Sequence, residues 1–246
     1  MANWHRATVQ QNHAWSDNLF SLKVDYPHGD FIAGQFVRLA LEVNGERVQR
    51  AYSLVNPPGV DYAEIYFTSV ADGKLSPALA ALQAGDSVDI SYPASGFFTL
   101  EEVPQGEALW LISTGTGIGP FLSMLGTDAP WQRFNQIVLV HGVRWQRDLA
   151  YQSLIQQLQQ QHPRQLDYVP VVSRESVQGA LQGHLTQHLQ NGAIQAQTGI
   201  LINPHSQVLL CGNPQMISEC KTWLLEQGLE KNLRRKPGQI TTEQYW

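Results

Sequence analysis

The chain of 246 residues lacks the features that mark several large protein classes. Its two cysteines, Cys211 and Cys220, are too few and too close together for a disulfide framework, so reduced thiols in a cytosolic compartment are the simpler interpretation. No apolar run approaches the length of a membrane span, and the N-terminal MANWHRATVQ lacks the apolar core of a signal sequence. We therefore expect a cytoplasmic chain with no membrane segment.

Charge and short catalytic signatures are scarce as well. Charged residues make up 15% of the chain and the net charge is −5, which does not favour nucleic acid as a partner. The HExxH, CxxC and GxSxG patterns are absent, so metalloproteases, zinc ribbons and α/β-hydrolases lose their usual signatures. His184 and His188 have helical spacing, but no carboxylate or further ligand completes a zinc site, and we expect no metal.

What the chain does have is enough length and apolar content for two domains. The first hundred residues contain short strand-like runs separated by turn sequences such as PHGD, NGE and ADG. The expected strands are 20–26, 35–42, 50–55, 65–70 and 87–92, with one short helix at 76–82. Several short strands at this spacing predict a small antiparallel barrel.

The pattern changes after residues 101–107. Buried-type apolar runs at 108–114, 137–143, 167–173 and 207–211 alternate with loops and helical segments such as 148–161. This alternation predicts a parallel sheet with helices on its faces. The sequence therefore predicts two domains, a β-barrel over residues 1–101 and an α/β domain over residues 102–246.

RAYSLVNPP is the stretch with the most chemical content. It presents a cation, an aromatic ring and a hydroxyl in close succession, in Arg50, Tyr52 and Ser53. On an extended strand, Arg50 can reach a phosphate, Tyr52 can lie against a flat ring, and Ser53 can bond the edge of that ring. A flavin nucleotide needs these contacts, although an aromatic-rich strand is more often only a strand.

A second anion site is expected in ADGKLSP. Ser76 is a good helix N-cap residue and Pro77 suits the first helical position, so a helix N-terminus beside Lys74 can attract phosphate. An ordinary capped helix is the alternative for this segment alone. Together with Arg50, it suits the two phosphates of a dinucleotide.

The turn after the first apolar run of the second domain is GTGIGP, residues 115–120. Its glycines let the backbone approach a ligand, although the spacing differs from the usual dinucleotide fingerprint. CGNPQM, residues 211–216, should reach the same sheet edge, where ligands of such sheets bind. Cys211 is either a small buried apolar residue or a polarizable group beside a reacting ring.

Arginines follow two other strands, in HGVRW and VVSRE. An arginine at a strand end is more often simply solvated. Together, however, Arg144 and Arg174 offer a phosphate site at the ligand edge of the sheet. The basic run Lys231–Lys236 is most simply a solvated helix end, and a docking patch for an acidic protein is the alternative.

Five motifs in order, RAYS, GKLSP, GTGIGP, CGNPQM and TTEQYW, make the whole chain resemble the bacterial ferredoxin/flavodoxin–NADP reductases, in particular the subgroup with a C-terminal Tyr-Trp pair. The resemblance implies an FAD-binding antiparallel Greek-key β-barrel followed by an NADP-binding α/β domain with a parallel sheet. It also implies hydride transfer between nicotinamide C4 and flavin N5, then one-electron steps with ferredoxin or flavodoxin, an acidic redox protein. A monomeric enzyme is expected.

The resemblance also assigns residues to sites. Those implied for FAD are Arg50, Ala51, Tyr52, Ser53, Tyr66, Phe67, Thr68, Lys74, Leu75, Ser76, Thr116, Tyr245 and Trp246. Those implied for NADP(H) are Val143, Arg144, Ser173, Arg174, His184, Gly212, Asn213 and Pro214. Ser53 and Cys211 would lie nearest the reacting flavin and nicotinamide and would act by positioning.

One position departs from the family pattern. His184 stands where close relatives often carry an arginine of the 2′-phosphate site, and histidine is charged only part of the time near neutral pH, so a weaker preference for NADP over NAD is open. Two other functions also stay open. One is an NAD(P)H:flavin or quinone reductase without a protein partner, and the other is a non-catalytic FAD-binding redox sensor.

Overall fold

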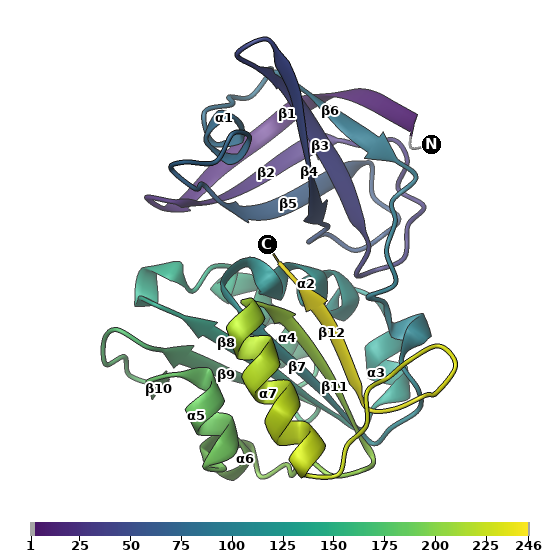
Figure 1. Cartoon of the computed structure of the whole chain (residues 1–246), viewed down its shortest axis with the longest axis vertical. Coiled ribbons are helices and arrows are strands. Elements are labelled where there is room, and N and C mark those ends of the chain that lie inside the picture. Colours follow the sequence, from purple (N-terminus) through teal and green to yellow (C-terminus); the bar gives the residue numbers. More distant parts are fainter. Residues whose placement is uncertain (1–2, 246) are drawn as a thin grey trace. The chain divides into compact units, whose positions relative to one another are not determined.

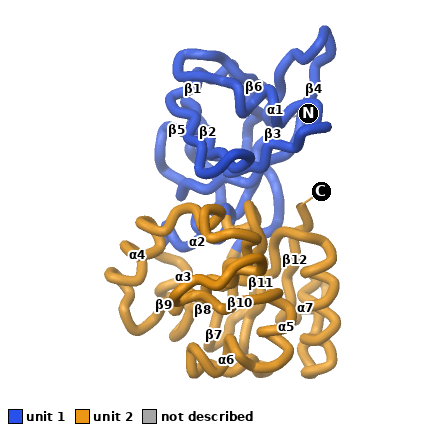
Figure 2. The backbone as a smooth tube through the Cα atoms, turned by 90° about the vertical axis from the view of Figure 1, so that its left-hand side faces the viewer, with its two compact units in different colours: residues 1–99, 119–127 blue, residues 100–118, 128–246 orange. Residues whose placement is uncertain are grey.

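The computed structural model describes residues 3–245 and divides into two compact units (Figure 1; Figure 2). The barrel unit takes the chain up to Thr99 together with Gly119–Thr127. The sheet unit takes Leu100–Ile118 and the chain from Asp128 onward. The chain therefore passes from one unit to the other more than once, and helix α2 (Gly119–Leu125) is part of the barrel unit.

Antiparallel strands build the barrel unit. They are β1 (Asn3–Ser16), β2 (Leu19–Asp25), β3 (Phe36–Val43), β4 (Glu46–Ser53), β5 (Tyr62–Thr68) and β6 (Ser87–Tyr92). Their order in the sheet is β4-β3-β6-β1-β2-β5. The sheet curls until its edges meet at a bridge between Leu54 and Ile65, beside a bond of 2.9 Å from Val55 N to the Glu64 carbonyl. The antiparallel barrel predicted from the sequence is confirmed.

Strand β1 was not predicted from the sequence. Its fourteen residues fully bury only Ala7 and Val9, and the rest are polar or partly exposed. Such a strand lacks the apolar alternation that strand prediction depends on. It is nevertheless central, because it pairs with β6 on one side and with β2 on the other.

Helix α2 completes the core of the barrel unit. The Phe121 ring lies 5.8 Å from that of Phe98, and Ser123 Oγ donates to the Asn56 carbonyl at 2.7 Å. All seven residues of α2 are buried. The other helix of this unit, α1 (Ser76–Ala80), is short and buries Leu79.

Parallel strands build the sheet unit. They are β7 (Ala108–Thr114), β8 (Gln136–Val143), β9 (Leu166–Val172), β10 (Leu181–Gln182), β11 (Ser206–Gly212) and β12 (Ile240–Gln244). Their order is β10-β9-β8-β7-β11-β12, so the direction of strand addition reverses between β7 and β11. In open sheets of this kind, ligands bind outside the carboxyl ends of the strands at such a switch point. The parallel α/β architecture predicted from the sequence is confirmed.

Helices and turns cover this sheet. They are η1 (Leu100–Glu102), η2 (Gly115–Ile118), α3 (Ala129–Arg133), η3 (Gln146–Asp148), α4 (Gln152–Gln161), α5 (Leu185–Gln190), α6 (Ala193–Thr198) and α7 (Pro214–Glu226). The core between helices and sheet contains the fully buried Trp110 and Ile112 of β7, together with valines of β8, β9 and β11. Within residues 3–245, no helix combines the length and the apolar character needed to cross a bilayer.

Candidate functional site

Strand β4 is an edge strand with a single sheet neighbour, β3, and it carries Arg50, Tyr52 and Ser53. Arg50 pairs with Leu39 and Tyr52 with Val37, so their side chains share one face of the sheet, whereas Ser53 lies on the other face. Burial raises the pKa of Tyr52 to about 12, against the opposing charge of Arg50. The phenol therefore stays protonated and offers a neutral, half-buried ring.

The opposite edge strand, β5, carries Tyr66, Phe67 and Thr68. The Phe67 ring stands edge-on to Tyr52, with 6.0 Å between centroids, so the two edge strands approach each other here. Phe67 is 2% exposed and belongs to the barrel core, as does Leu75, which is also 2% exposed. These two side chains are therefore occupied in the core, and either residue can reach a ligand only through its backbone.

Lys74 is brought to the β4 edge by an ion pair. Its Nζ lies 3.0 Å from Glu46 Oε2, and both side chains are largely exposed. An exposed pair of this kind contributes at most about 1 kcal/mol, so a phosphate can displace the carboxylate. Lys74 thus adds a second cation to the strand that carries Arg50.

Ser76 does not have the role expected from the sequence. Helix α1 begins at Ser76 with Leu75 at the capping position, and the Ser76 hydroxyl instead accepts the Val70 N–H at 3.0 Å. The hydroxyl closes the preceding turn, while its own hydrogen can still be donated to a phosphate.

These residues fit a dinucleotide that ends in a flat ring. Edge strands leave one row of backbone donors and acceptors outside the sheet, and here that row borders a neutral aromatic ring and two cations. The fit concerns the barrel unit alone. The structure places Arg50 and Tyr52 on one face of β4, and their contacts with a phosphate and a flat ring stay predictions.

In the sheet unit, the switch point is formed by the turn η2 after β7 and by the end of β11. A Cβ on Gly117 would lie 2.5 Å from the Cys211 carbonyl oxygen, and one on Gly212 would lie 2.5 Å from Thr114 Oγ1. The Thr114 hydroxyl also accepts the Asn213 N–H at 2.9 Å. Gly117 therefore lacks a side chain because the backbone of β11 packs directly against it. The sequence had suggested that the glycines of this turn allow close approach to a ligand.

His141, on β8, forms a hydrogen bond with this turn. Its Nε2 lies 3.0 Å from the Gly115 carbonyl oxygen, and burial lowers the pKa of His141 to about 4. The ring is therefore neutral at pH 7, and Nε2 carries the hydrogen because a carbonyl can only accept. Among the described residues Nδ1 has no hydrogen-bond partner. Sequence reasoning passed over this residue because a single histidine in an apolar strand gives no signal.

Cys211 is fully buried at the carboxyl end of β11. Burial raises the pKa of the Cys211 thiol well above its usual range, with a further rise from the charge of Glu243 and an opposing hydrogen bond with Tyr245. Register explains the neighbours, because β12 pairs Cys211 with Glu243 and the Tyr245 N–H donates to the Gly212 carbonyl at 3.1 Å. Glu243, which the sequence did not single out, is thus a neighbour of Cys211 in the structure. Trp246 lies outside the described residues.

The loops after β8 and β9 run side by side. Ser173 N–H donates to the Val143 carbonyl and Arg174 N–H to the Arg144 carbonyl, both at 3.0 Å. Both arginine side chains are exposed. Two cations at one sheet edge are what the sequence predicted for a phosphate site.

The remaining predicted nucleotide residues lie at two helix starts. His184 occupies the capping position of α5, but its side chain makes no hydrogen bond to the helix. The preceding residue is tied to β9, because the Gly183 N–H donates to the Val172 carbonyl. Asn213 caps α7 by accepting from Gln215 N and Met216 N. Its amide oxygen is thereby occupied, and a ligand would meet the backbone around Gly212. Among residues 3–245, no cluster of His, Cys, Asp and Glu could hold a metal ion.

A pocket of about 510 Å³ lies beside the two arginines, and sequence reasoning missed its lining. Trp145, Gln146, Arg147 and Glu175 line it. The first three follow directly after HGVR, so an aromatic residue and a cation next to that motif were the available signal.

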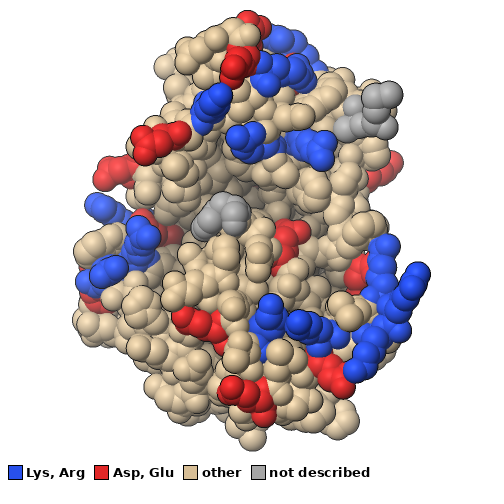
Figure 3. Space-filling view, in the orientation of Figure 1, with Lys and Arg blue, Asp and Glu red and all other residues tan. Residues whose placement is uncertain are grey.

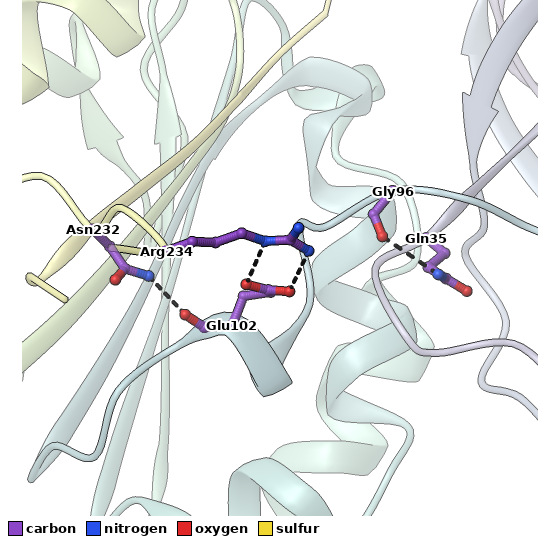
Figure 4. A network of polar contacts seen from close by, with 5 residues as sticks. All are labelled: Gln35, Gly96, Glu102, Asn232 and Arg234. Atoms are coloured by element: carbon purple, nitrogen blue, oxygen red, sulfur yellow. Dashed lines mark hydrogen bonds and ion pairs between the residues drawn. The ribbon is translucent and has the colours of Figure 1, made fainter. Parts of the chain in front are cut away.

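The basic run Lys231–Lys236 is not the helix end that was the simpler expectation. Helix α7 ends at Glu226, and Leu233 and Lys236 exchange backbone hydrogen bonds of 3.0 and 2.9 Å in a tight turn. Arg234 forms two hydrogen bonds with the Glu102 carboxylate (Figure 4). Lys and Arg side chains gather over this loop at the lower right of Figure 3.

Comparison with known proteins gives a consistent result for both units. Residues 6–98 match the model of an oxidoreductase FAD-binding domain, and residues 111–222 match that of an oxidoreductase NAD-binding domain. The flavodoxin/ferredoxin–NADP reductase of Escherichia coli (strain K12) is 46% identical over 248 residues, with 100% of each chain covered. The ferredoxin–NADP reductase of Pseudomonas aeruginosa is 34% identical, with 99% of this chain and 98% of that one covered.

A solved structure shows the same fold. The ferredoxin NADP+ reductase of Neisseria gonorrhoeae, with bound FAD and NADP, superposes with a TM-score of 0.94 at 29% identity. The match covers 100% of both chains. Both the barrel and the parallel sheet are therefore present in that relative.

Proposed function

This chain belongs to the flavodoxin/ferredoxin–NADP reductase family, and we propose on that basis that it moves electrons between NADP(H) and ferredoxin or flavodoxin, with FAD as its cofactor. One observation carries the proposal. The 46% identity extends over the full length of both chains, so it includes the FAD-type barrel and the NAD-type sheet together.

Bound FAD would supply the two-electron and one-electron redox chemistry that no side chain has. In the barrel unit, we assign the cofactor phosphates to Arg50, Lys74 and the Ser76 hydroxyl. Tyr52 would place its neutral ring against the flat ring system, and Ser53 would position the edge of that ring. The backbones of β5 and of Leu75 would line the rest.

In the sheet unit, we assign the nicotinamide end to Cys211 and the backbone of Gly212 and Asn213. The thiol stays protonated because burial raises its pKa, so it contributes a small neutral surface that excludes water. Arg144 and Arg174 would bind phosphate at the adenosine end. The assignments of Thr116, Tyr245 and Trp246 to FAD remain predictions from the resemblance.

Further expectations belong to the same proposal. The barrel domain would end near residue 101, the enzyme would be monomeric, and its protein partner would be acidic. The basic turn at Lys231–Lys236 supports the last point, because acidic proteins are attracted to clustered cations.

Anaerobic titration of the purified protein with NADPH, and then with NADH, followed by flavin absorbance, tests this function. We expect a yellow protein whose flavin band bleaches with NADPH, and which then reduces ferredoxin or flavodoxin faster than free flavin at matched concentration. Faster reduction of free flavin or quinone would favour the partner-free reductase. An FAD-containing protein that NADPH does not bleach would favour the sensor, and a colourless protein that FAD cannot reconstitute would contradict all three.

A further inference from the structure

The loop after β8 is built around a short, well-fixed turn. At the start of η3 (Gln146–Asp148), the N–H of the preceding Trp145 donates to Asp148 Oδ2 at 3.2 Å, and the Asp148 N–H donates to the Trp145 carbonyl at 2.9 Å. The Gln146 N–H donates to the Glu175 carboxylate, which ties this turn to the loop after β9. Trp145 and Arg147 therefore project from a backbone that is held at both ends.

The lining of the adjoining pocket combines a flat ring with a cation. Trp145 is 40% exposed, which is unusual for so large an apolar side chain, and Arg147 lines the same volume of about 510 Å³. An exposed indole is a surface on which a purine base can stack, and a guanidinium binds a phosphate monoester through two parallel hydrogen bonds. Together they match an adenosine that carries a phosphate on its ribose.

Glu175 provides the opposing charge in this pocket. A carboxylate at such an edge accepts the ribose 2′-hydroxyl of NAD, whereas an arginine accommodates the 2′-phosphate of NADP. One Glu175 oxygen is occupied by the Gln146 N–H, which weakens it as a hydroxyl acceptor. Lys and Arg side chains gather at the left of Figure 3, with acidic side chains among them. The loops after β8 and β9 carry three arginines, Arg144, Arg147 and Arg174, beside the carboxylates of Asp148 and Glu175.

We propose that Arg147 is a specificity-determining residue that binds the 2′-phosphate of NADP(H), with Trp145 stacked on the adenine. This rests on the proposed function, and it goes beyond the residues that the sequence had assigned to the nucleotide. It also bears on His184, because Arg147 would offer the planar guanidinium fork that a histidine at 184 lacks.

The test is calorimetric binding of two probes, adenosine 2′,5′-bisphosphate and 5′-AMP, to the FAD-loaded protein. We expect Arg147→Ala to weaken the bisphosphate about tenfold and 5′-AMP less than twofold, because only the former carries the group that Arg147 binds. Arg147→Lys should recover part of the loss, since it restores the charge without the fork. Trp145→Ala should weaken both probes by a similar factor of about five.

The matched control is Arg164→Ala, an exposed arginine just before the amino-terminal end of β9, at the opposite edge of the same sheet. It should leave both affinities unchanged. Equal losses for both probes in Arg147→Ala, or no loss for the bisphosphate, would overturn the proposal. Retained FAD absorbance and flavin bleaching by saturating NADPH in the same variant would show that the proposed function stands whatever the binding result, while their absence in the unmutated protein would contradict the function itself.

Discussion

The two units present their functional groups in different ways. In the sheet unit, β7, β8 and β11 are buried along almost their whole length, and the candidate ligand groups lie on the turns that follow them. In the barrel unit, the candidate groups lie along β4 itself, which fully buries only Val48 and Ser53. Parallel strands are covered on both faces, whereas antiparallel strands can leave a face or an edge to solvent. The sheet unit should therefore be intolerant at its turns, and the barrel unit should separate function from stability.

The sharpest test of the intolerant turns is Gly117→Ala. The new Cβ would meet the backbone of Cys211 and Gly212 at 2.5 to 2.9 Å, and backbone cannot rotate away as a side chain can. We expect a loss of about 3 kcal/mol in the free energy of unfolding of the sheet unit, measured by hydrogen exchange in denaturant.

Gly119→Ala is the matched control, two residues further on. Its Cβ would meet only the Val55 side chain, at 3.3 Å, so less than about 1 kcal/mol should be lost. If both variants lose the same free energy of unfolding, the turns of the sheet unit are no less tolerant than the barrel unit.

The next effect concerns acid. The pKa of His141 falls to about 4 in the folded chain, below its ordinary value of 6.5, because burial disfavours the charged ring. Between these values the unfolded chain binds more protons, so stability is complete above pH 6.5 and declines as the pH falls toward 4. His141 alone should lower the free energy of unfolding by about 3 kcal/mol between pH 6.5 and pH 4.

Denaturant unfolding at several pH values checks this decline. His141→Asn should start less stable at pH 7 but show a shallower decline between pH 6.5 and 4. An unchanged slope in that variant would assign the acid sensitivity to other groups.

The smallest effect tests whether the barrel unit separates function from stability. Ser53→Ala should slow the transient rate of hydride transfer about tenfold, or roughly 1.4 kcal/mol in the barrier, while FAD stays bound. Stopped-flow absorbance under anaerobic conditions measures it. Ser87→Ala, on β6 of the same barrel, is the control and should leave the rate alone. A normal rate in Ser53→Ala would reject a positioning role for Ser53.

The sequence was most informative where burial is continuous or alternates along a strand. The run at 108–114 coincides with β7, and the alternating segment 87–92 coincides with β6. Strand β1 escaped prediction because its partners, and not its own apolar residues, hold it in place. Strand β12 escaped for a similar reason, since ITTEQ pairs with β11 despite a mostly polar sequence.

Among the site residues, the sequence predicted placement where position along a strand decides it, while the binding roles stay predictions. Arg50 and Tyr52 share a face of an edge strand, and Arg144 and Arg174 lie on adjacent loops, as their positions after strands suggested. Prediction failed where the role depends on how a loop folds. The Ser76 hydroxyl accepts from Val70 instead of capping its helix, and Arg147 gains meaning only beside Trp145 and Glu175.

Helix α2 has a consequence for the order in which the chain becomes structured during synthesis. Domains tend to fold as their residues leave the ribosome, yet the barrel unit lacks Phe121 and Ser123, the partners of Phe98 and Asn56, until Gly119–Thr127 has emerged. By then the apolar β7 is already outside, while its sheet neighbours β8 and β11 are still to be made. The nascent chain therefore passes through a stage with a complete barrel and an unpartnered apolar strand, which is the interval in which a chaperone would be most useful.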